Sequence, residues 1–346
     1  MKLHENISLF RDAIRFTAQQ MDLKPEYVEK DYWITHALFT IFNNEIGKDT
    51  VFKGGTSLSK CYKLIERFSE DIDLVVLRRE GETDSRLKSK LKVISKAVEP
   101  LLAEVPIEGI THKMGMNRKT AHTYNKEFKG NYGQVRDVII LESTWLGYYE
   151  PFTTRSIVSF IGQMMMENKQ FEIAKDNELL PFELLVLEPI RTICEKIMSL
   201  VRFSYGENPV EDLKNKIRHA YDLHQLLQQD EFSKFFHSED FDKMLLKVAS
   251  DDVVSFKNNN KWLIHHPSEA LFFKNLENVW NDLKTTYTND FKDLVYGALP
   301  KEKAILDTLK IIRERILNIQ WQTIEQIINN SDISKSKSNK CPKTNT

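Results

Sequence analysis

Residues 51–77 read VFKGGTSLSKCYKLIERFSEDIDLVVL, and this stretch decides the fold. The pattern predicts a short strand at Val51–Lys53, a tight turn at Gly54–Gly55, a helix from Thr56 to Glu66 and a second strand at Ile72–Leu77. Two aspartates stand where the second strand begins, directly ahead of an apolar run. Because buried carboxylates are costly, this pair requires an explanation.

The two aspartates are Asp71 and Asp73. Since side chains alternate along a strand, both project from one face, roughly 6 to 7 Å apart, while Ile72 and Leu74 face the opposite side. Two hard oxygen donors on one face suit Mg²⁺, which binds carboxylates together with substrate phosphates. A lone D-x-D more often caps a turn or forms salt bridges. The glycine turn upstream is what favours a metal site here.

The glycine turn and the start of the next helix are expected to contact a phosphate through Gly54, Gly55, Thr56 and Ser57. Glycines let a backbone approach an anion closely, and the first turn of a helix offers N–H groups and a positive dipole end. A Gly-Gly pair alone more often only starts a helix. Here a single helix of about three turns joins the glycines to the D-x-D, so that both return to the same edge of the sheet.

Composition sets the outer limits on function. The chain has 346 residues, 41% of them hydrophobic, which is enough for a buried core and predicts two domains. Its 49 basic and 50 acidic residues give a formal charge of -1, so any anionic partner must meet a local patch. Three scattered cysteines offer no disulfide framework. With no signal-peptide core and no membrane-length apolar run, we expect a cytoplasmic protein that makes no membrane contact.

The elements predict an α+β protein in three parts. Residues 1–175 combine lead-in helices with the stretch above and with strands at Val105–Thr111 and Gln134–Thr144. Residues 176–330 read as helical, with segments near 182–203, 210–230, 239–249, 268–297 and 300–330. Residues 331–346, rich in Ser, Lys and Asn, have almost nothing to bury and are expected to be a disordered tail.

Four motifs resemble one known family. KGGTSLSKCYKLIERFSEDIDL looks like the first motif of the AbiEii/AbiGii toxins, the nucleotidyltransferase-like toxins of type IV toxin–antitoxin systems that include the MenT toxins. YVEKDYWITHAL is similar to the family's N-terminal signature, ICEKIMSLVRF to its lysine motif and IRHAYDLHQLL to its last acidic motif. The resemblance spans roughly residues 27 to 230. It implies a polymerase-β-like nucleotidyltransferase core with a helical C-terminal domain.

The resemblance also assigns roles to residues. It makes Asp71 and Asp73 the metal-binding catalytic acids, Lys196 the motif lysine and Asp222 the final acid. Without it, Lys196 would be expected only to snorkel to solvent, and Asp222 could simply pair with Arg218 four positions earlier.

Three further residues are assigned to nucleotide binding: Arg67, Ser69 and Arg202. Arg202 stands six positions after Lys196, one short of the family spacing. Ser69 falls where some family members are phosphorylated by their antitoxin.

A third acid usually completes a two-metal site. The best candidate is Glu142 in DVIILEST, which reads as an adjacent strand with Ile140, Glu142 and Thr144 on one face. The alternative is an ordinary salt bridge at the end of a strand.

The segment from His112 to Arg136 mixes cations with aromatic rings, as nucleic-acid binders do. A solvated hairpin loop is the alternative interpretation. The residues concerned are Lys113, Arg118, Lys119, Lys126, Lys129 and Arg136, with Tyr124, Phe128 and Tyr132 between them.

Together these features predict a Mg²⁺-dependent nucleotidyltransferase toxin that causes growth arrest or abortive infection and has a cognate antitoxin. It would transfer NMP from an NTP, CTP or GTP, to an RNA acceptor; the MenT resemblance implies the tRNA 3′ end. Two alternatives remain open from the sequence. The chain could be a toxin that binds GTP and a partner without transfer, or it could transfer NMP to a protein or a small molecule.

Overall fold

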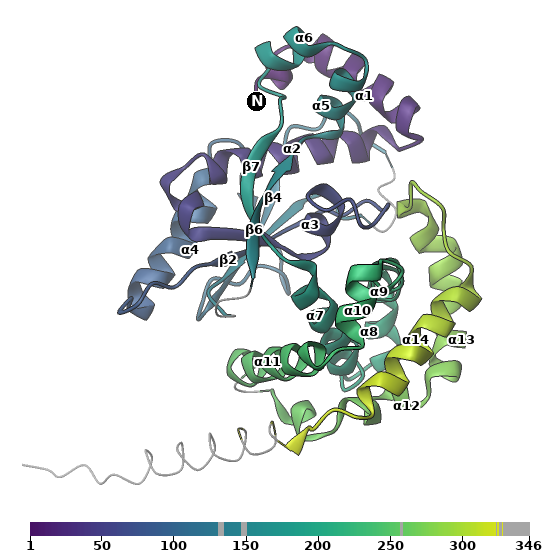
Figure 1. Cartoon of the computed structure of the whole chain (residues 1–346). Helices are drawn as coiled ribbons and strands as arrows, with labels where there is room; N and C mark the ends of the chain where they lie inside the picture. Colours follow the sequence, from purple (N-terminus) through teal and green to yellow (C-terminus); the bar gives the residue numbers. More distant parts are fainter. Residues whose placement is uncertain (131–134, 147–150, 257–258, 323, 325–326, 328–346) are drawn as a thin grey trace, which may run out of the picture. The chain divides into compact units, whose positions relative to one another are not determined.

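The computed structural model describes residues 1–130, 135–146, 151–256, 259–322, 324 and 327 (Figure 1). The chain divides into two compact units. The first comprises Met1–Pro189 and Asn289–Leu299, and the second comprises Ile190–Thr288 and Pro300–Thr346. The tail expected at residues 331–346 lies outside the described residues.

The described part of the first unit is built on a seven-stranded mixed sheet of order β3-β4-β5-β2-β1-β7-β6. β1 pairs antiparallel with β2 and parallel with β7, and β2 pairs parallel with β5. The remaining neighbours, β3–β4, β4–β5 and β6–β7, are antiparallel. The strands are β1 Thr50–Lys53, β2 Asp71–Val76, β3 Ala103–Val105, β4 Asn117–Thr123, β5 Ile139–Thr144, β6 Phe152–Ile157 and β7 Phe182–Leu187.

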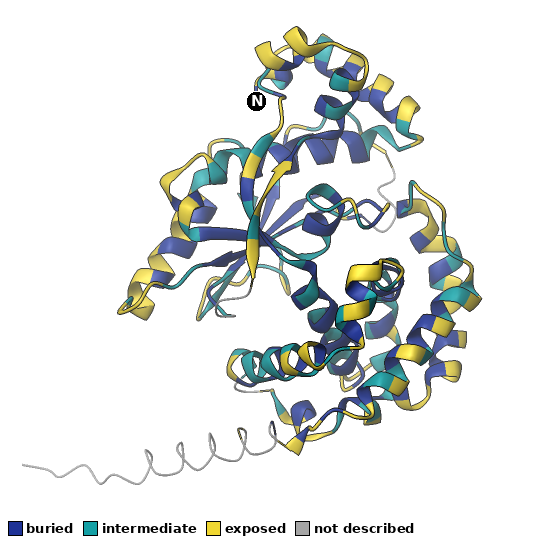
Figure 2. Ribbon diagram, in the orientation of Figure 1, coloured by how far each residue is buried: buried dark blue, intermediate teal, exposed yellow. Residues whose placement is uncertain are grey.

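Helices flank this sheet, and several of them begin where the sequence supplies a start signal. The Asn6 side chain accepts from the Leu9 N–H to cap α1, Pro25 opens α2, and Thr83 caps α4 by accepting from the Arg86 N–H. α2 and α4 contact each other, and both contact β2. Figure 2 shows that α2 is buried along most of its length. The helices are α1 Ile7–Met21, α2 Pro25–Phe42, α3 Gly54–Lys60, α4 Asp84–Val98, α5 Phe160–Glu167 and α6 Phe171–Asp176.

The described part of the second unit contains helices and no strand. α9 packs against α10 and α14, α13 packs against α8, α12 and α14, and buried aromatic rings such as Phe236, Phe241 and Phe272 fill the core. The helices are α7 Pro189–Phe203, α8 Pro209–Lys214, α9 Ile217–Leu227, α10 Asp230–Phe236, α11 Glu239–Ser255, α12 Leu271–Lys274, α13 Leu276–Thr285 and α14 Glu302–Ile316. The α+β class predicted from the sequence is therefore confirmed.

Several predicted element boundaries were wrong. The helix expected at 182–203 is strand β7 followed by α7, because Pro189 cannot continue a strand ladder but can open a helix. The helix expected to reach Glu66 ends at Lys60, and the strand expected at 105–111 stops at Val105, directly before Pro106. β7 belongs to the sheet of the first unit, and the compact units divide at Pro189. The domain boundary expected at residue 175 stays a prediction.

No helix within the described ranges is long and apolar enough to span a bilayer.

Three consecutive charged residues of α2 hold the region around the aspartates in place. Glu29 accepts hydrogen bonds from the backbone N–H groups of Glu127 and Phe128, at 2.7 and 3.0 Å. Lys30 pairs with Glu70 at 2.7 Å, immediately before β2. Asp31 pairs with Lys60 of α3 at 2.5 Å. All three α2 side chains are buried, so the segment resembling a family signature acts as a polar anchor for α3 and β2.

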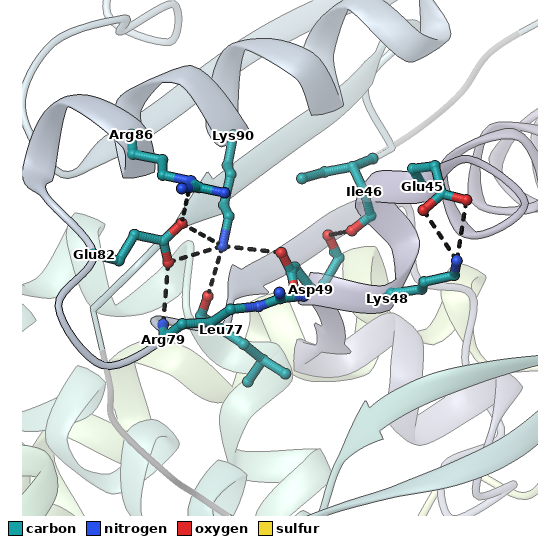
Figure 3. A network of polar contacts seen from close by, with 10 residues as sticks. Glu45, Ile46, Lys48, Asp49, Leu77, Arg79, Glu82, Arg86 and Lys90 are labelled. Carbon is teal, nitrogen blue, oxygen red and sulfur yellow. Dashed lines mark hydrogen bonds and ion pairs between the residues drawn. The ribbon is translucent and has the colours of Figure 1, made fainter.

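A second polar network fastens the other end of the β1–β2 pair (Figure 3). Lys90 of α4 contacts Asp49 at 3.0 Å and Glu82 at 2.7 Å, and it donates to the Leu77 carbonyl at 3.3 Å. Asp49 directly precedes β1 and Leu77 directly follows β2. The β1–β2 pair is thus held by Lys30 and Glu70 at one end and by Lys90 at the other.

Removing one partner of the buried Lys30–Glu70 pair should be costly. Both side chains are at most 1% exposed, so Glu70→Gln leaves the Lys30 ammonium buried without its carboxylate. We expect the free energy of unfolding to fall by about 3 kcal/mol, measured by urea titration. Glu45→Gln removes an exposed pair with Lys48 and is the control, with a change below about 0.5 kcal/mol. Equal, small effects of the two changes would contradict this account.

A histidine in α2 makes the first unit acid-sensitive. Burial, the nearby N-terminus and His4 lower the pKa of His36 to about 3, and its Nδ1 has no hydrogen-bond partner among the described residues. The unfolded chain therefore binds this proton first as pH falls below about 6.5, and stability is lost on acidification. We expect the wild type to lose about 1 kcal/mol more than His36→Phe between pH 7 and pH 5.5. Unfolding curves of the two proteins at each pH give this difference, and pH profiles that run parallel would refute it.

Candidate active site

The double glycine lies where β1 turns into α3, beside the second aspartate. β1 ends at Lys53, which pairs with Asp73 across the antiparallel ladder. Gly54 has φ +82, a left-handed conformation, and a Cβ added there would collide with the Asp73 Oδ2. A Cβ on Gly55 would lie 2.8 Å from the Arg67 Nη2. In this structure the glycines therefore make room for the side chains of the site itself.

Hydroxyl groups tie the start of α3 to the acidic strand. Thr56 Oγ1 lies 2.5 Å from the Asp71 carbonyl oxygen and 3.0 Å from the Ser69 Oγ. Ser57 Oγ donates to the Gly54 carbonyl at 2.8 Å. The bond from Thr56 to Asp71 connects the turn to β2 directly, and both Thr56 and Ser57 are buried. Ser69 is half-buried in this network, and its phosphorylation stays a prediction.

The predicted row of carboxylates is present on one face of the sheet. Asp71 and Asp73 alternate with the buried Ile72 and Leu74, as expected, and Asp73 pairs in register with Glu142 of β5. On the next strand, Lys119 of β4 stands opposite Glu142. The three acids predicted from separate motifs thus come from two neighbouring strands and share one face.

Repulsion between the carboxylates of this row shifts their pKa values. Burial, Glu142 and Asp71 together raise the pKa of Asp73 to about 7. Burial alone would also raise the pKa of Glu142, but the charge and hydrogen bond of Lys119 reverse this and hold it below its usual value. Burial opposes the charged form of Lys119 as well, yet its pKa is raised by Glu142, Asp71 and Asp73. The acids and the cations of this face therefore shift one another's pKa values, with Asp73 as the acid whose charged form is disfavoured most.

Glu142 already has partners for both carboxylate oxygens. Lys119 Nζ lies 2.8 Å from its Oε2, and Asn117 Nδ2 donates to its Oε1 at 2.9 Å. No three His, Cys, Asp or Glu side chains within the described ranges converge as a metal-binding group. The donors that fit a divalent cation are the hard oxygens of Asp71 and Asp73. Glu142 as a third ligand stays a prediction.

Arg136 connects the aspartates to the anchor in α2. Its backbone N–H donates to Glu70 at 2.8 Å, its carbonyl accepts from Lys30 at 2.6 Å, and its Nη1 lies 3.8 Å from the Asp71 Oδ1. A cation is therefore already next to Asp71, supplied from the end of the basic stretch.

Arg67, by contrast, is buried. Its guanidinium packs beside Gly55, and its Nη1 donates to the Phe68 carbonyl at 3.0 Å. The backbone of Arg67 forms an isolated β-bridge with Val295. The neighbouring Phe68 N–H donates to the Leu294 carbonyl at 2.7 Å. Here Arg67 supports the turn, and a contact between Arg67 and nucleotide stays a prediction.

In the second unit, the two residues assigned from the later motifs meet. Lys196 of α7 and Asp222 of α9 form an ion pair of 2.6 Å, with side chains only 6% and 0% exposed. The lysine therefore does not snorkel to solvent, and Asp222 pairs with Lys196 from the neighbouring helix. Arg202, one turn and a half further along α7, lies over the rings of Phe203 and Phe256 at 4.8 and 4.5 Å.

The fold agrees with the result of comparing the sequence with known protein families. Residues 36–311 match the family described as nucleotidyl transferase AbiEii toxin of type IV toxin–antitoxin systems. The chain belongs to this family. Membership brings with it a nucleotidyltransferase activity, a nucleotide substrate and a cognate antitoxin. A search of curated proteins finds no match to the sequence.

The basic stretch of this AbiEii-family chain is mostly engaged with the chain's own acids. Lys113 pairs with Glu104, Lys119 with Glu142, Lys126 with Asp137 and Arg136 with Glu70 and Asp71. Of its aromatic residues, Tyr124 is buried and stacks on Trp33, while Tyr132 lies outside the described residues. Part of the stretch is strand β4, so it is not simply a solvated loop. RNA binding by this stretch stays a prediction.

Sequence reasoning missed the individual roles of Lys119 and Asn117. Their strand, NRKTAHT, lacks the apolar alternation that identifies a strand. One signal could have found Lys119: a strand that carries the acid Glu142 needs a neighbouring strand with a positive charge opposite it. Lys30 was likewise inside a quoted motif, but its buried pairing with Glu70 depends on tertiary contacts.

The close approach of Gly54 to Asp73 can be tested against a matched glycine. Gly81 has a similar φ, +73, but a Cβ there meets nothing within 4 Å. Gly81→Ala should cost about 1 kcal/mol from backbone strain, whereas Gly54→Ala should cost about 3 kcal/mol because it also displaces Asp73. Urea unfolding of both variants measures the difference. Equal costs would show that Asp73 does not depend on the absent side chain.

Proposed function

We propose that this chain transfers a nucleoside monophosphate from an NTP, CTP or GTP, to the 3′ hydroxyl of an RNA acceptor, a tRNA. The observation that carries the proposal is the register of β1, β2 and β5, which sets Asp71, Asp73 and Glu142 beside the glycine turn in a family of nucleotidyl transferases. The choice of tRNA follows the resemblance to the MenT branch. Modification of tRNA accounts for growth arrest or abortive infection by such a toxin.

The reaction requires attack by the acceptor hydroxyl on the α-phosphorus. A new P–O bond forms, the bond from the α-phosphorus to the bridging oxygen breaks, and pyrophosphate leaves while the hydroxyl proton is lost. Mg²⁺ held by Asp71 and Asp73 would neutralise charge on the triphosphate and on the leaving pyrophosphate. Glu142 holds Lys119 beside the aspartates, and Lys53 lies opposite Asp73, so this face of the sheet also supplies two fixed cations for the phosphates.

The residues of the second unit supply the remaining part of the proposal. Lys196 contacts the triphosphate, and Asp222 orients it through the 2.6 Å ion pair. A buried, paired lysine loses little side-chain entropy when it binds an anion, which favours this role over a purely structural one. Arg202, near the end of the same helix, is a further cation for a nucleotide phosphate. The antitoxin neutralises the enzyme, and Ser69 is the position where phosphorylation would block the glycine turn.

Replacing Asp73 by Asn tests the proposal. Purified wild-type protein is incubated with Mg²⁺, with each α-labelled NTP in turn, and with total RNA or cell extract. We expect label in the RNA fraction with one preferred NTP, and at least a thousandfold loss of labelling in Asp73→Asn. The variant should be as stable as the wild type, because it removes a charge that burial and two acids already disfavour.

Asp137→Asn is the matched control, since Asp137 is 68% exposed and pairs with Lys126 at 3.0 Å. It should label RNA like the wild type. Full labelling by Asp73→Asn would overturn the proposed chemistry. Label in protein or in small molecules would overturn the RNA acceptor alone, and nucleotide binding with no transfer to any fraction would favour a toxin that acts by binding.

A further inference from the structure

The second unit contains a pocket of about 440 Å³ formed entirely by its own residues. It lies at the C-terminal end of α7. Its walls come from the last residues of this helix and those just after it, and from Asp212 of α8, Phe256, Asn259, Lys261, Trp262 and His265. A pocket of this size matches a ligand of small-molecule dimensions. Its wall after α11 is fixed by internal hydrogen bonds: Asn259 N–H donates to the Phe256 carbonyl at 2.8 Å, and Trp262 Nε1 donates to the Asn259 carbonyl at 3.1 Å.

One wall is a flat aromatic platform. Tyr205 and His265 stack in parallel, with ring centroids 5.4 Å apart and planes 9° from each other. Tyr205 is 38% exposed although its neighbours Phe203 and Trp262 supply apolar surface against which a tyrosine could be buried. An exposed, pre-stacked ring is what a planar ligand needs, because stacking on it loses little conformational freedom.

The cations of the pocket stand beside this platform. Arg202 rests on the faces of Phe256 and Phe203, at 4.5 and 4.8 Å, so its guanidinium is held in place by the rings. Lys261, five residues after Phe256, also lines the pocket, and its side chain is exposed. A phosphate attached to a stacked base would meet two positive charges here.

A carboxylate completes the lining. The Asp212 carboxylate lies so close to Gly206 that a Cβ at that position would collide with it. The glycine therefore leaves space for an acceptor that faces the pocket, and carboxylate oxygens accept from the ring N–H and amino groups of bases. Aromatic faces, cations and one acceptor together form the set that recognises a nucleotide.

We propose that this pocket binds a single nucleotide unit, with the base stacked on Tyr205, the phosphate at Arg202 and Lys261, and base N–H groups donating to Asp212. The inference rests on the proposed function: if the chain modifies RNA, the pocket holds one nucleotide of that RNA acceptor. The same chemistry would also recognise a free nucleoside monophosphate, so the test includes both sources.

Binding is measured in the Asp73→Asn protein with EDTA present, which removes both transfer and metal-dependent nucleotide binding. The ligands are the four nucleoside monophosphates, by calorimetry, and a labelled single-stranded tetranucleotide RNA, by anisotropy. We expect Tyr205→Ala to weaken binding about tenfold, the usual effect of one lost base stack, and Tyr205→Phe to restore it. Lys261→Ala should weaken binding about threefold to tenfold, through the phosphate.

Two controls keep the result specific to the pocket. Phe171→Ala removes an aromatic ring that is 54% exposed in the first unit, and Lys274→Ala removes an exposed lysine of α12. Neither should change the affinity. RNA binding that depends on Tyr205 supports the pocket as an acceptor site, and binding of monophosphates alone supports it as a site for free nucleotide.

No binding of any ligand at millimolar concentration, or an affinity unchanged in Tyr205→Ala, would overturn the inference. These outcomes are distinguishable from failure of the proposed function. If the wild type labels RNA while Tyr205→Ala binds normally, only the pocket assignment is wrong. If Tyr205-dependent binding is found but no fraction is ever labelled, the transferase proposal is wrong and the pocket remains a nucleotide site.

Discussion

Three carboxylates placed side by side on one sheet face are the constraint on which the rest of the first unit depends. Their mutual repulsion and their burial raise the pKa of Asp73 to about 7, so the row is stable only if cations stand next to it. The chain supplies Lys119 at Glu142 and Arg136 at Asp71. In the proposed function, a metal ion bound with its nucleotide would supply further positive charge at Asp73, the acid next to the glycine turn.

The surrounding structure holds this unfavourable arrangement in place. Buried acids and bases of α2 anchor the start of β2 through Glu70 and the end of α3 through Lys60. At the far end of the same strands, Lys90 joins Asp49 and Glu82. Such buried pairs add little net stability compared with apolar packing, but each fixes one geometry because breaking it exposes a buried charge. Rigid strands and fixed side chains are what a reactive site needs.

Much of this site could be predicted from sequence because the relevant rules are local. Alternation along a strand places Asp71 and Asp73 on one face whatever the rest of the chain does, and the same rule places Glu142 on its strand. The turn at Gly54 was equally local. Strand β7 was not predicted, because a six-residue apolar run that continues into a helix has no distinguishing period.

Charge partners were beyond local rules. Lys119 belongs to a polar strand that pairs with β5 only in the folded chain, and Lys30 becomes an anchor only because Glu70 is brought to it. The same holds for Tyr205 and His265, which are far apart in sequence and form one platform in the second unit. Local patterns therefore indicated which acids share a face, while the compensating cations and the pocket emerged only from tertiary contacts.

The central claim is that the two aspartates of β2 hold a divalent cation. It is tested most directly by diffraction from crystals grown with Mn²⁺ and a non-hydrolysable NTP analogue, using the anomalous signal of manganese. The account predicts a strong anomalous peak within about 2.0 to 2.3 Å of carboxylate oxygens from both Asp71 and Asp73, bridged to the triphosphate. A bound nucleotide with no manganese at these residues, or manganese held only elsewhere, would contradict it.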